Sequence, residues 1–365
     1  MYNEIRRAAH CGAQQARDES RAADSEDLNV TKRKIGILGA GTWGMALARM
    51  LCVSGNDVLV WSAIEKEIDA LSSTRVHPNL PGMKIPEELR FTKSVEEVCR
   101  DKDILLFAVP SVFVRSTAAK ARPYVAEGQI IVDVAKVIEP DTLYTMTEVL
   151  ADELGREGGP KKVHLVALSG PTHAEEVARD MPTLIVAAST DVAAAAAVQK
   201  IFNSPTFRVY TNTDRKGVEL GGAVKNVIAL AVGIGLGLGY GDNAKAALIT
   251  RGNAELARLG EAMGCQASTF AGLSGMGDLI VTCTSMHSRN LHAGMLLGRG
   301  RTAAEARAEV GQVVEGMNAL PAARRLAKKY KVEMPIVESV GAILDGTLAA
   351  RDALAALMGR DLKAE

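Results

Sequence analysis

The chain has 365 residues, 47% of them hydrophobic, which is long for one domain and natural for two. Its 43 Lys and Arg residues balance its 43 Asp and Glu residues, so it has neither a basic field for nucleic acid nor an acidic tail. The five scattered cysteines include no C-x-x-C pair, which argues against a disulfide framework or a zinc site and is typical of a reducing, cytoplasmic compartment. We expect no bound metal.

Residues 1–31 differ from everything that follows. Arg, Asp, Glu, Ala and Ser dominate, and Ile5 and Leu28 are the only large aliphatic residues before Val30. This composition predicts a disordered N-terminal extension. The Arg-rich first half also fits a weak targeting segment, although the several acids argue against it. An overlong gene prediction, with folding starting near Val30, fits equally well.

The next stretch, Lys34 to Gly44, is the one that organises the chain. An apolar strand runs into Gly39-x-Gly41-x-x-Gly44 and then into a segment of helical composition. This is the dinucleotide-binding fingerprint, in which Gly39 permits a tight turn, Gly41 lets the backbone approach a pyrophosphate and Gly44 allows close packing of helix on strand. The helix N-terminus offers unpaired N–H groups to the phosphates.

Strand-like and helix-like segments then alternate as far as about Tyr210. The apolar runs predicted as strands are 57–61, 103–109, 129–133, 163–167, 183–187 and 207–210. Such alternation predicts an α/β fold, an N-terminal Rossmann-type doubly wound sheet with parallel strands, spanning residues 32–212. After it only helical patterns remain, so we expect an all-helical domain at 213–358 and a tail at 359–365.

One apolar run, Val227 to Tyr240, is long enough to raise the question of a membrane. It falls short of the roughly 20 residues that a membrane span needs and is interrupted by glycines. We therefore predict a buried helix and no membrane span.

Three loops that follow predicted strands carry polar residues. They are Ala108 to Ser111, Asp133 to Lys136 and Leu168 to Thr172, the last leading to Ala174 at a helix start. Turn and cap chemistry accounts for Pro110 and Ser111. It accounts less well for Lys136, a cation placed where ligands of such sheets bind.

The helical domain has an anomaly of its own. Lys225 and Asn226 lie in the middle of an apolar, small-residue helix that begins Leu220-Gly-Gly-Ala-Val. A lysine there is costly unless it is paired or reaches out to solvent, because desolvation disfavours the ammonium. Burial can lower its pKa toward neutrality, so Lys225 is a candidate general acid or base; a lysine at the helix edge is the structural alternative.

Two polar clusters follow on glycine-rich helices. Asp278 and Thr282 are spaced four residues apart and so share a helix face. Ser288, Arg289 and Asn290 gather donors at a helix start, which suits a phosphate dianion. The structural alternative, a helix cap at Asp278 and a solvated Arg289, explains each cluster singly but not both together.

The ordered motifs resemble NAD(P)-dependent glycerol-3-phosphate dehydrogenase of the bacterial type. The resemblance runs from Lys34 to about Met358 and rests on the order and spacing of seven motifs. They are Gly39-Ala-Gly-Thr-Trp-Gly44, Ser169-Gly-Pro-Thr172, Gly221-Gly-Ala-Val-Lys-Asn226, the stretch 243–251, Gly277-Asp278, Ser288-Arg-Asn290 and Gly311-Gln-Val-Val-Glu-Gly316.

The resemblance implies reversible reduction of dihydroxyacetone phosphate to sn-glycerol 3-phosphate, with NAD or NADP as cofactor. It implies catalytic roles for Lys225, as general acid or base, and Asp278. The implied substrate-binding residues are Lys136, Gly170, Thr172, Asn226, Thr282, Ser288, Arg289 and Asn290. The implied cofactor-binding residues are Gly39, Gly41, Thr42, Trp43, Gly44, Lys136, Ala174, Arg289, Val313 and Glu315. A homodimer and a supply of glycerophospholipid precursors are also implied.

The preference between NAD and NADP stays open. Many relatives carry Arg or His where this chain has Ala63, and such a cation would favour the 2′-phosphate of NADP. Glu65 is close but displaced from the position at which an acid favours NAD. The missing cation indicates that NAD can be used.

Two other functions share parts of this pattern. A dehydrogenase for 3-hydroxy acids could share the glycine fingerprint and a helix-borne lysine but would not need the phosphate cluster around Arg289. A non-catalytic dinucleotide sensor would have no reason to keep Lys225, Asp278 and Arg289 together. The fold alone does not separate these functions.

Overall fold

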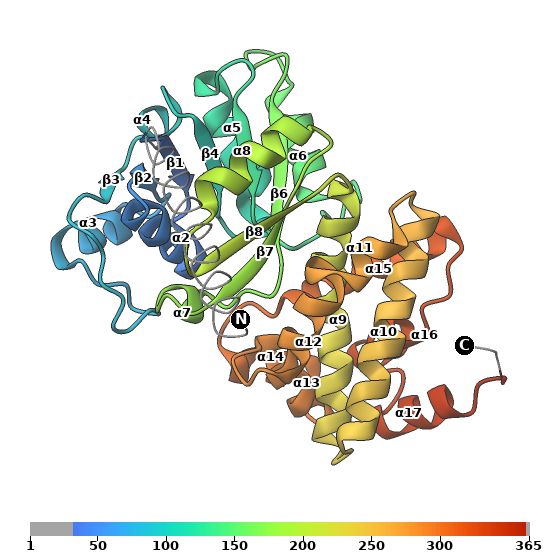
Figure 1. Cartoon of the computed structure of the whole chain (residues 1–365). Helices are drawn as coiled ribbons and strands as arrows, with labels where there is room; N and C mark the ends of the chain where they lie inside the picture. Colours follow the sequence, from blue (N-terminus) through green and yellow to red (C-terminus); the bar gives the residue numbers. More distant parts are fainter. Residues whose placement is uncertain (1–31, 363–365) are drawn as a thin grey trace, which may run out of the picture. The chain divides into compact units, whose positions relative to one another are not determined.

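The first half of the chain forms an eight-stranded sheet covered by helices (Figure 1). The computed structural model describes residues 32–362, so the predictions for residues 1–31 and for the last three residues lie outside it. The strands are β1 Lys34–Leu38, β2 Asp57–Trp61, β3 Arg90–Thr92, β4 Ile104–Phe107, β5 Ile130–Asp133, β6 His164–Ser169, β7 Thr183–Ala188 and β8 Phe207–Asn212. Their order across the sheet is β3-β2-β1-β4-β5-β6-β7-β8.

Alternate residues of the strands feed two separate cores. On one face, Ile35 and Ile37 of β1 pack with helices α2 (Thr42–Val53), α3 (Glu65–Thr74) and α8 (Val192–Phe202). On the other face, Leu38 packs with α4 (Val95–Cys99), α5 (Val114–Ala121) and α6 (Met146–Leu154). Burial on both faces explains why most strands are continuous apolar runs. Shorter elements are η1 (Ser111–Phe113), η2 (Arg122–Tyr124) and α7 (Ala174–Val177).

The direction of the last two strands corrects the prediction of a parallel sheet. Strands β1 to β6 are parallel, but β7 pairs with β6 in the antiparallel sense and β8 is parallel to β7. The segment between β6 and β7 contains only the four-residue helix α7. A four-residue helix rises only about 6 Å, well short of the roughly 20 Å length of a six-residue strand, so it does not return the chain to the amino end of β6. The chain therefore turns back at the carboxyl end of β6.

This reversal sets where the helical half begins. Because β7 and β8 run against the direction of β1 to β6, β8 ends on the side of the sheet where β1 to β6 have their amino ends. Helix α9 (Arg215–Gly237) starts there. The ten residue steps from Arg215 to Lys225 rise about 15 Å, close to the length of a five-residue strand. Helix α9 thus returns Lys225 to the level of the strands' carboxyl ends, and α9 contacts β6 and β7 on the way.

Only helices follow β8 within the described residues. They are α9, α10 (Asp242–Ala262), α11 (Ala267–Ala271), the π-helix η3 (Leu273–Gly277), α12 (Asp278–Thr284), α13 (Arg289–Gly298), α14 (Ala303–Val310), α15 (Glu315–Tyr330), α16 (Pro335–Leu344) and α17 (Ala350–Met358). The α/β class with a helical C-terminal half is confirmed. From Lys34 onward the described chain groups as one compact unit, and the boundary near residue 212 stays a prediction.

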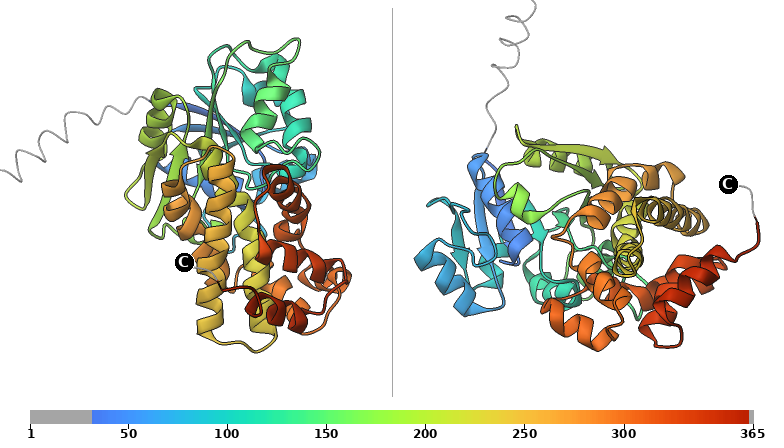
Figure 2. Two further views of the ribbon diagram at one scale, coloured as in Figure 1. Left: turned by 90° about the vertical axis from the view of Figure 1, so that its right-hand side faces the viewer. Right: turned by 90° about the horizontal axis from the view of Figure 1, so that it is seen from below.

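Helix α9 is the core of the helical half. Figure 2 shows it beside α10, and α12, α13 and α15 also contact it. It is the one helix of residues 32–362 long and apolar enough to cross a membrane, yet 83% of its apolar window is buried within the fold. The apolar run that starts at Val227 is therefore a helix buried as far as Gly235, as predicted, while residues 239–240 lie beyond the helix and are exposed. Where α13 crosses it, a Cβ on Gly294 would lie 2.3 Å from the carbonyl oxygen of Leu230, so the two backbones touch.

Candidate active site

Lys225 lies inside the fold and not at the helix edge. Its side chain is 7% exposed. The ammonium donates to Asp278 Oδ1 at 2.5 Å and to Thr282 Oγ1 at 2.7 Å. These two bonds use two of its three N–H groups among the described residues. No acceptor among residues 32–362 takes the third.

Asp278 and Thr282 share one face of α12, as their spacing predicted. The Thr282 hydroxyl donates to the backbone oxygen of Asp278 at 2.6 Å, so its lone pairs face the Lys225 ammonium. Asp278 is 1% exposed, and each of its carboxylate oxygens takes a different lysine. The buried carboxylate therefore fixes two cations at once.

The second of these cations is Lys136, from the loop after β5. Its ammonium donates to Asp278 Oδ2 at 2.9 Å, to the carbonyl oxygen of Gly170 at 2.9 Å and to Thr172 Oγ1 at 3.3 Å. All three donors are thus directed to protein acceptors. Lys136 thus links the loop after β6 to α12. Its positive charge also lies close to the Lys225 ammonium, because both groups bond to the Asp278 carboxylate.

The electrostatics of the site poise Lys225 near neutrality. Burial lowers the pKa of Lys225 to about 8; the nearby Asp278 carboxylate opposes that shift and the positive charge of Lys136 adds to it. A lysine with a pKa close to the working pH can both give and take a proton. This is the property expected of a general acid or base.

A second set of predicted residues meets at the start of α13. Ser288 caps that helix by accepting from the N–H of Leu291 at 3.2 Å. The Asn290 side chain donates to Asn226 Oδ1 at 3.0 Å and accepts from the N–H of Gly316 at 2.8 Å. Asn290 therefore joins α9, α13 and α15 in one polar network.

Three more predicted residues lie beside this network: Glu315 is hydrogen-bonded to it, whereas Arg289 and Val313 are exposed. Glu315 accepts a long hydrogen bond of 3.4 Å from Asn226 Nδ2, which links a predicted cofactor residue to a predicted substrate residue. Arg289 is exposed, and no hydrogen bond or ion pair of its side chain is recorded in the described part of the chain. Val313, on the loop before α15, is 56% exposed.

The glycine fingerprint has the geometry that a dinucleotide requires. Gly39 adopts φ +126°, and a Cβ there would lie 2.6 Å from the carbonyl group of Ala108. A Cβ on Gly44 would lie 2.2 Å from the carbonyl oxygen of Gly39. Gly41 is exposed, with no atom within 4 Å of a Cβ built on it, and as N-cap of α2 it offers no side chain to the first-turn N–H groups. The helix N-terminus is thus open to a phosphate.

The fingerprint also lies at the right place in the sheet. From β1 the chain continues to β2 and β3 on one side of β1 and then crosses to β4 on the other side. Ligands of such sheets bind outside the carboxyl ends of the strands at this switch point. Trp43 and Ala174 pack against the same core cluster there, partly buried, and Thr42 is partly buried beside them in the first turn of α2. The residues present therefore fit a dinucleotide.

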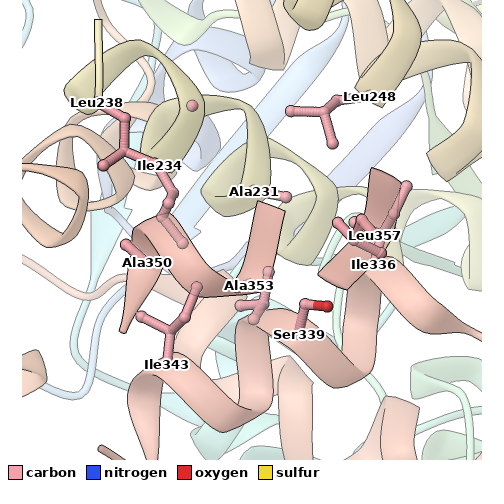
Figure 3. A pocket seen from close by; sticks show the side chains of 12 residues that line it. Ala231, Ile234, Leu238, Leu248, Ile336, Ser339, Ile343, Ala350, Ala353 and Leu357 are labelled. Atoms are coloured by element: carbon pink, nitrogen blue, oxygen red, sulfur yellow. The ribbon is translucent and has the colours of Figure 1, made fainter. Parts of the chain in front are cut away.

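The cavity in Figure 3 lies elsewhere and has a different character. Residues of α9, α10, α16 and α17 line it, among them Ile234, Ile343 and Leu357. No titratable side chain is among its lining residues. We assign it to packing within the helical half.

Two histidines that the sequence analysis did not single out meet at the site. The rings of His173 and His287 lie 6.1 Å apart, edge to face, although they come from different halves of the chain. Burial lowers the pKa of His173, so its imidazole is neutral at pH 7. Each histidine adjoins a predicted loop, after Thr172 and before Ser288, and that adjacency was the available signal.

The fold and the site together define a class of protein, a nicotinamide-dependent dehydrogenase built from a Rossmann-type sheet and a helical half that carries a buried lysine. Two family models narrow the class. The N-terminal model of NAD-dependent glycerol-3-phosphate dehydrogenase matches residues 34–195, and the C-terminal model of the same enzyme matches residues 214–355. The chain belongs to the NAD-dependent glycerol-3-phosphate dehydrogenase family.

Individual relatives agree with the family. The chain is 63% identical over 332 residues to glycerol-3-phosphate dehydrogenase [NAD(P)+] 2 of Lactobacillus delbrueckii subsp. bulgaricus, covering 91% of this chain and 98% of that one. It is 50% identical to glycerol-3-phosphate dehydrogenase [NAD(P)+] of Agathobacter rectalis, covering 91% and 97%. The crystal structure of glycerol-3-phosphate dehydrogenase from Coxiella burnetii superimposes with a TM-score of 0.84 at 36% identity, covering 90% and 99%.

Proposed function

We propose that this protein catalyses the reversible, NAD(P)H-dependent reduction of dihydroxyacetone phosphate to sn-glycerol 3-phosphate, with Lys225 as the general acid and base. The observation that carries the proposal is the buried Lys225 ammonium, held by Asp278 and Thr282 with one N–H left for a ligand. Family membership supports the choice of substrate.

The reaction adds a hydride to C2 of the ketone and a proton to its oxygen. The nicotinamide supplies the hydride when bound, and takes it back in the reverse direction. Negative charge develops on the ketone oxygen in the transition state, so a positioned proton donor lowers the barrier. The free N–H of Lys225 is that donor, and Asp278 keeps the ammonium from turning away.

The lowered pKa of Lys225 makes the rate of each direction of the reaction depend on pH. Below about pH 8 the lysine is mainly an ammonium, which is the form that donates a proton to the ketone. Above that pH it is mainly the neutral amine, which is the form that takes a proton from the alcohol of glycerol 3-phosphate. Lys136 favours this balance by placing a second positive charge near Lys225.

The remaining predicted residues divide between substrate and cofactor. We assign the substrate phosphate to Arg289 with Ser288 and the first turn of α13, because a guanidinium without a partner among residues 32–362, beside a helix N-terminus, suits a dianion. Anchoring the phosphate directs binding energy to the orientation of C2. Asn226, Asn290, Thr282, Gly170 and Thr172 complete the substrate pocket around Lys136. Gly39, Gly41, Thr42, Trp43, Gly44, Ala174, Val313 and Glu315 would hold the dinucleotide, with Lys136 and Arg289 near its nicotinamide end.

Cofactor preference depends on the end of β2. Ala63 is exposed, and Glu65 at the start of α3 lies 3.6 Å from Lys93 in an ion pair. No cation stands at position 63 to bind a 2′-phosphate, and the Glu65 carboxylate is shared with Lys93. We propose that the enzyme uses NADH at least as well as NADPH.

The cellular setting completes the proposal. We propose a cytoplasmic homodimer whose product, sn-glycerol 3-phosphate, serves as the backbone for glycerophospholipid synthesis. The state of assembly is measured by analytical ultracentrifugation, in which a sedimenting mass of one chain, 38.6 kDa, contradicts the dimer.

A substrate panel separates this function from its two rivals. The purified protein is assayed for NADH and NADPH oxidation with dihydroxyacetone phosphate, with unphosphorylated dihydroxyacetone and with 3-keto acids. The proposal predicts turnover with the phosphorylated ketone, and a large loss of kcat/KM without the phosphate. Turnover confined to 3-keto acids indicates the hydroxy-acid dehydrogenase, and NADH binding without any turnover indicates the sensor.

A further inference from the structure

Two adjacent glycines in the middle of α9, Gly221 and Gly222, stand four and three residues before Lys225. Glycine destabilises a helix interior relative to alanine, and both positions are buried. Neither has a positive φ that would require glycine. A reason for both must therefore lie in what approaches the helix.

Gly221 faces the π-helix η3. A Cβ built on Gly221 would lie 2.9 Å from the carbonyl oxygen of Ser274 and 3.6 Å from the Cα of Gly275. These neighbours are backbone atoms, which cannot turn aside as a side chain can. Gly221 thus allows α9 and η3 to touch at the level of their main chains.

The contact between Gly221 and Ser274 lies the same number of residues before each member of the Lys225–Asp278 pair. Lys225 comes four residues after Gly221 on α9, and Asp278 comes four residues after Ser274, at the junction of η3 and α12. One turn beyond the backbone contact, the two side chains meet at 2.5 Å. The closeness of the backbones therefore sets how far Asp278 stands from Lys225.

Gly222 faces the other partner of Asp278. A Cβ on Gly222 would lie 3.0 Å from Ser169 Oγ and 3.4 Å from Lys136 Cγ. The methylene chain of Lys136 thus packs against the backbone of α9 where Gly222 has no side chain. Its ammonium then reaches Asp278 at 2.9 Å. A methyl group here would meet a hydroxyl and a flexible chain, both of which can move.

We infer that Gly221 and Gly222 are positioning residues for catalysis: they are the spacers that let η3 and Lys136 approach α9 closely enough for Lys225 and Lys136 to share the Asp278 carboxylate. The inference rests on the proposed function for its kinetic consequences, but its geometry stands without it. A methyl group at Gly221 displaces Ser274, and with it Asp278, by a few tenths of an ångström. Asp278 then supports the Lys225 ammonium less well.

The charges around Lys225 determine whether its pKa rises or falls when Asp278 is displaced. The groups that bear on it are Asp278 of α12, Lys136 after β5, Glu315 of α15, His173 before α7 and Cys283 of α12. His173 and the Cys283 thiol are neutral at pH 7, because burial lowers the pKa of the first and raises that of the second to about 12. Asp278 is the nearest anion, so moving it away lowers the pKa of Lys225.

The test compares three glycine-to-alanine variants of α9. Gly221→Ala meets a backbone oxygen and Gly222→Ala meets a hydroxyl. Gly235→Ala is the matched control, since its Cβ would meet only a leucine methyl group at 3.4 Å. For each variant we would measure kcat and KM for dihydroxyacetone phosphate. The pKa of Lys225 would be measured separately, from the pH dependence of its acetylation by acetic anhydride, followed by mass spectrometry.

The inference predicts a graded result. Gly221→Ala lowers the Lys225 pKa by about one pH unit, and therefore lowers kcat about twofold at pH 7 and about fivefold at pH 8, with KM changed less than twofold. Gly222→Ala, whose neighbours can move, has a smaller effect on both quantities, and Gly235→Ala changes neither. Wild-type kcat and Lys225 pKa in Gly221→Ala overturn the inference, as does an equal loss in Gly235→Ala. If Gly221→Ala does not fold, a wild-type kcat in Gly222→Ala overturns it.

The labelling measurement also keeps the two proposals apart. If the wild-type protein fails to reduce dihydroxyacetone phosphate, the proposed function is wrong, and the acetylation pKa values still decide whether Gly221 positions Asp278. If the wild-type protein is active and the acetylation pKa of Lys225 is the same in all variants, the function stands and the inference is wrong.

Discussion

Replacing Asp278 by Asn tests the electrostatic part of the mechanism. The amide keeps the size of the carboxylate but removes the charge that supports the Lys225 ammonium. Burial and the positive charge of Lys136 both lower the pKa of Lys225, and the Asp278 charge then no longer opposes them. The loss of a close opposite charge lowers a pKa by about 1–3 units, which takes Lys225 from about 8 to about 6.

The size of the kinetic effect follows from this shift. At pH 7 a lysine with a pKa of about 8 is roughly nine-tenths protonated, and one with a pKa of about 6 is roughly one-tenth protonated. The proton-donating form thus falls roughly tenfold, and kcat for ketone reduction at pH 7 falls by at least as much. The loss is smaller near pH 5, where both proteins carry the ammonium.

The assay is the pH dependence of kcat for NADH oxidation by dihydroxyacetone phosphate. The wild-type rate falls as the pH rises through about 8, and the rate of Asp278→Asn falls as the pH rises through about 6. Asp242→Asn is the matched control, because Asp242 pairs with Lys245 at 2.6 Å but is 89% exposed. An alkaline inflection that stays near pH 8 in Asp278→Asn would refute the electrostatic argument.

Three further predictions concern phosphate binding, cofactor choice and stability. Arg289→Ala raises KM for dihydroxyacetone phosphate tenfold or more with a smaller change in kcat, measured by steady-state kinetics; an unchanged KM places the phosphate elsewhere. Ala63→Arg raises the ratio of kcat/KM for NADPH to that for NADH at least tenfold, and an unchanged ratio removes position 63 from cofactor selection. Glu255, buried against the N–H groups of Ile336 and Val337, has a pKa raised by burial to about 7. Its carboxyl therefore favours the folded state below about pH 4.5 and loses that contribution, about 3 kcal/mol, as the pH rises through 7. Urea unfolding should accordingly show Glu255→Gln gaining stability relative to wild type between pH 5 and pH 8, and parallel curves would contradict this.

The parts of the fold that depend on local pattern were predictable from the sequence. The glycine fingerprint needs only a strand, three glycines and a helix in succession, and the structure has them between Lys34 and Val53. The buried lysine was visible because one charged residue interrupts an apolar helix. Asp278 and Thr282 were visible as a pair because the α-helical repeat brings residues four apart onto one face.

The parts that depend on tertiary contacts were not predictable. An apolar run does not encode strand direction, so the reversal at β7 had no local signal. Strand β3 is three residues long and holds one buried residue, which is too short a pattern to recognise. Lys136 and Asp278 are 142 residues apart, and only the meeting of the loop after β5 with α12 makes them partners. The same is true of His173 and His287.

The most direct test of the account is the comparison of Lys225→Ala with the wild-type protein. Oxidation of NADH and NADPH by dihydroxyacetone phosphate is measured for both, and NADH binding is followed in parallel by its fluorescence. The account predicts turnover by the wild-type protein, a loss of kcat of several orders of magnitude in Lys225→Ala, and NADH binding that changes less than about threefold. Near-normal turnover in Lys225→Ala, or an equal loss of NADH affinity, would contradict the assignment of Lys225 as the general acid and base.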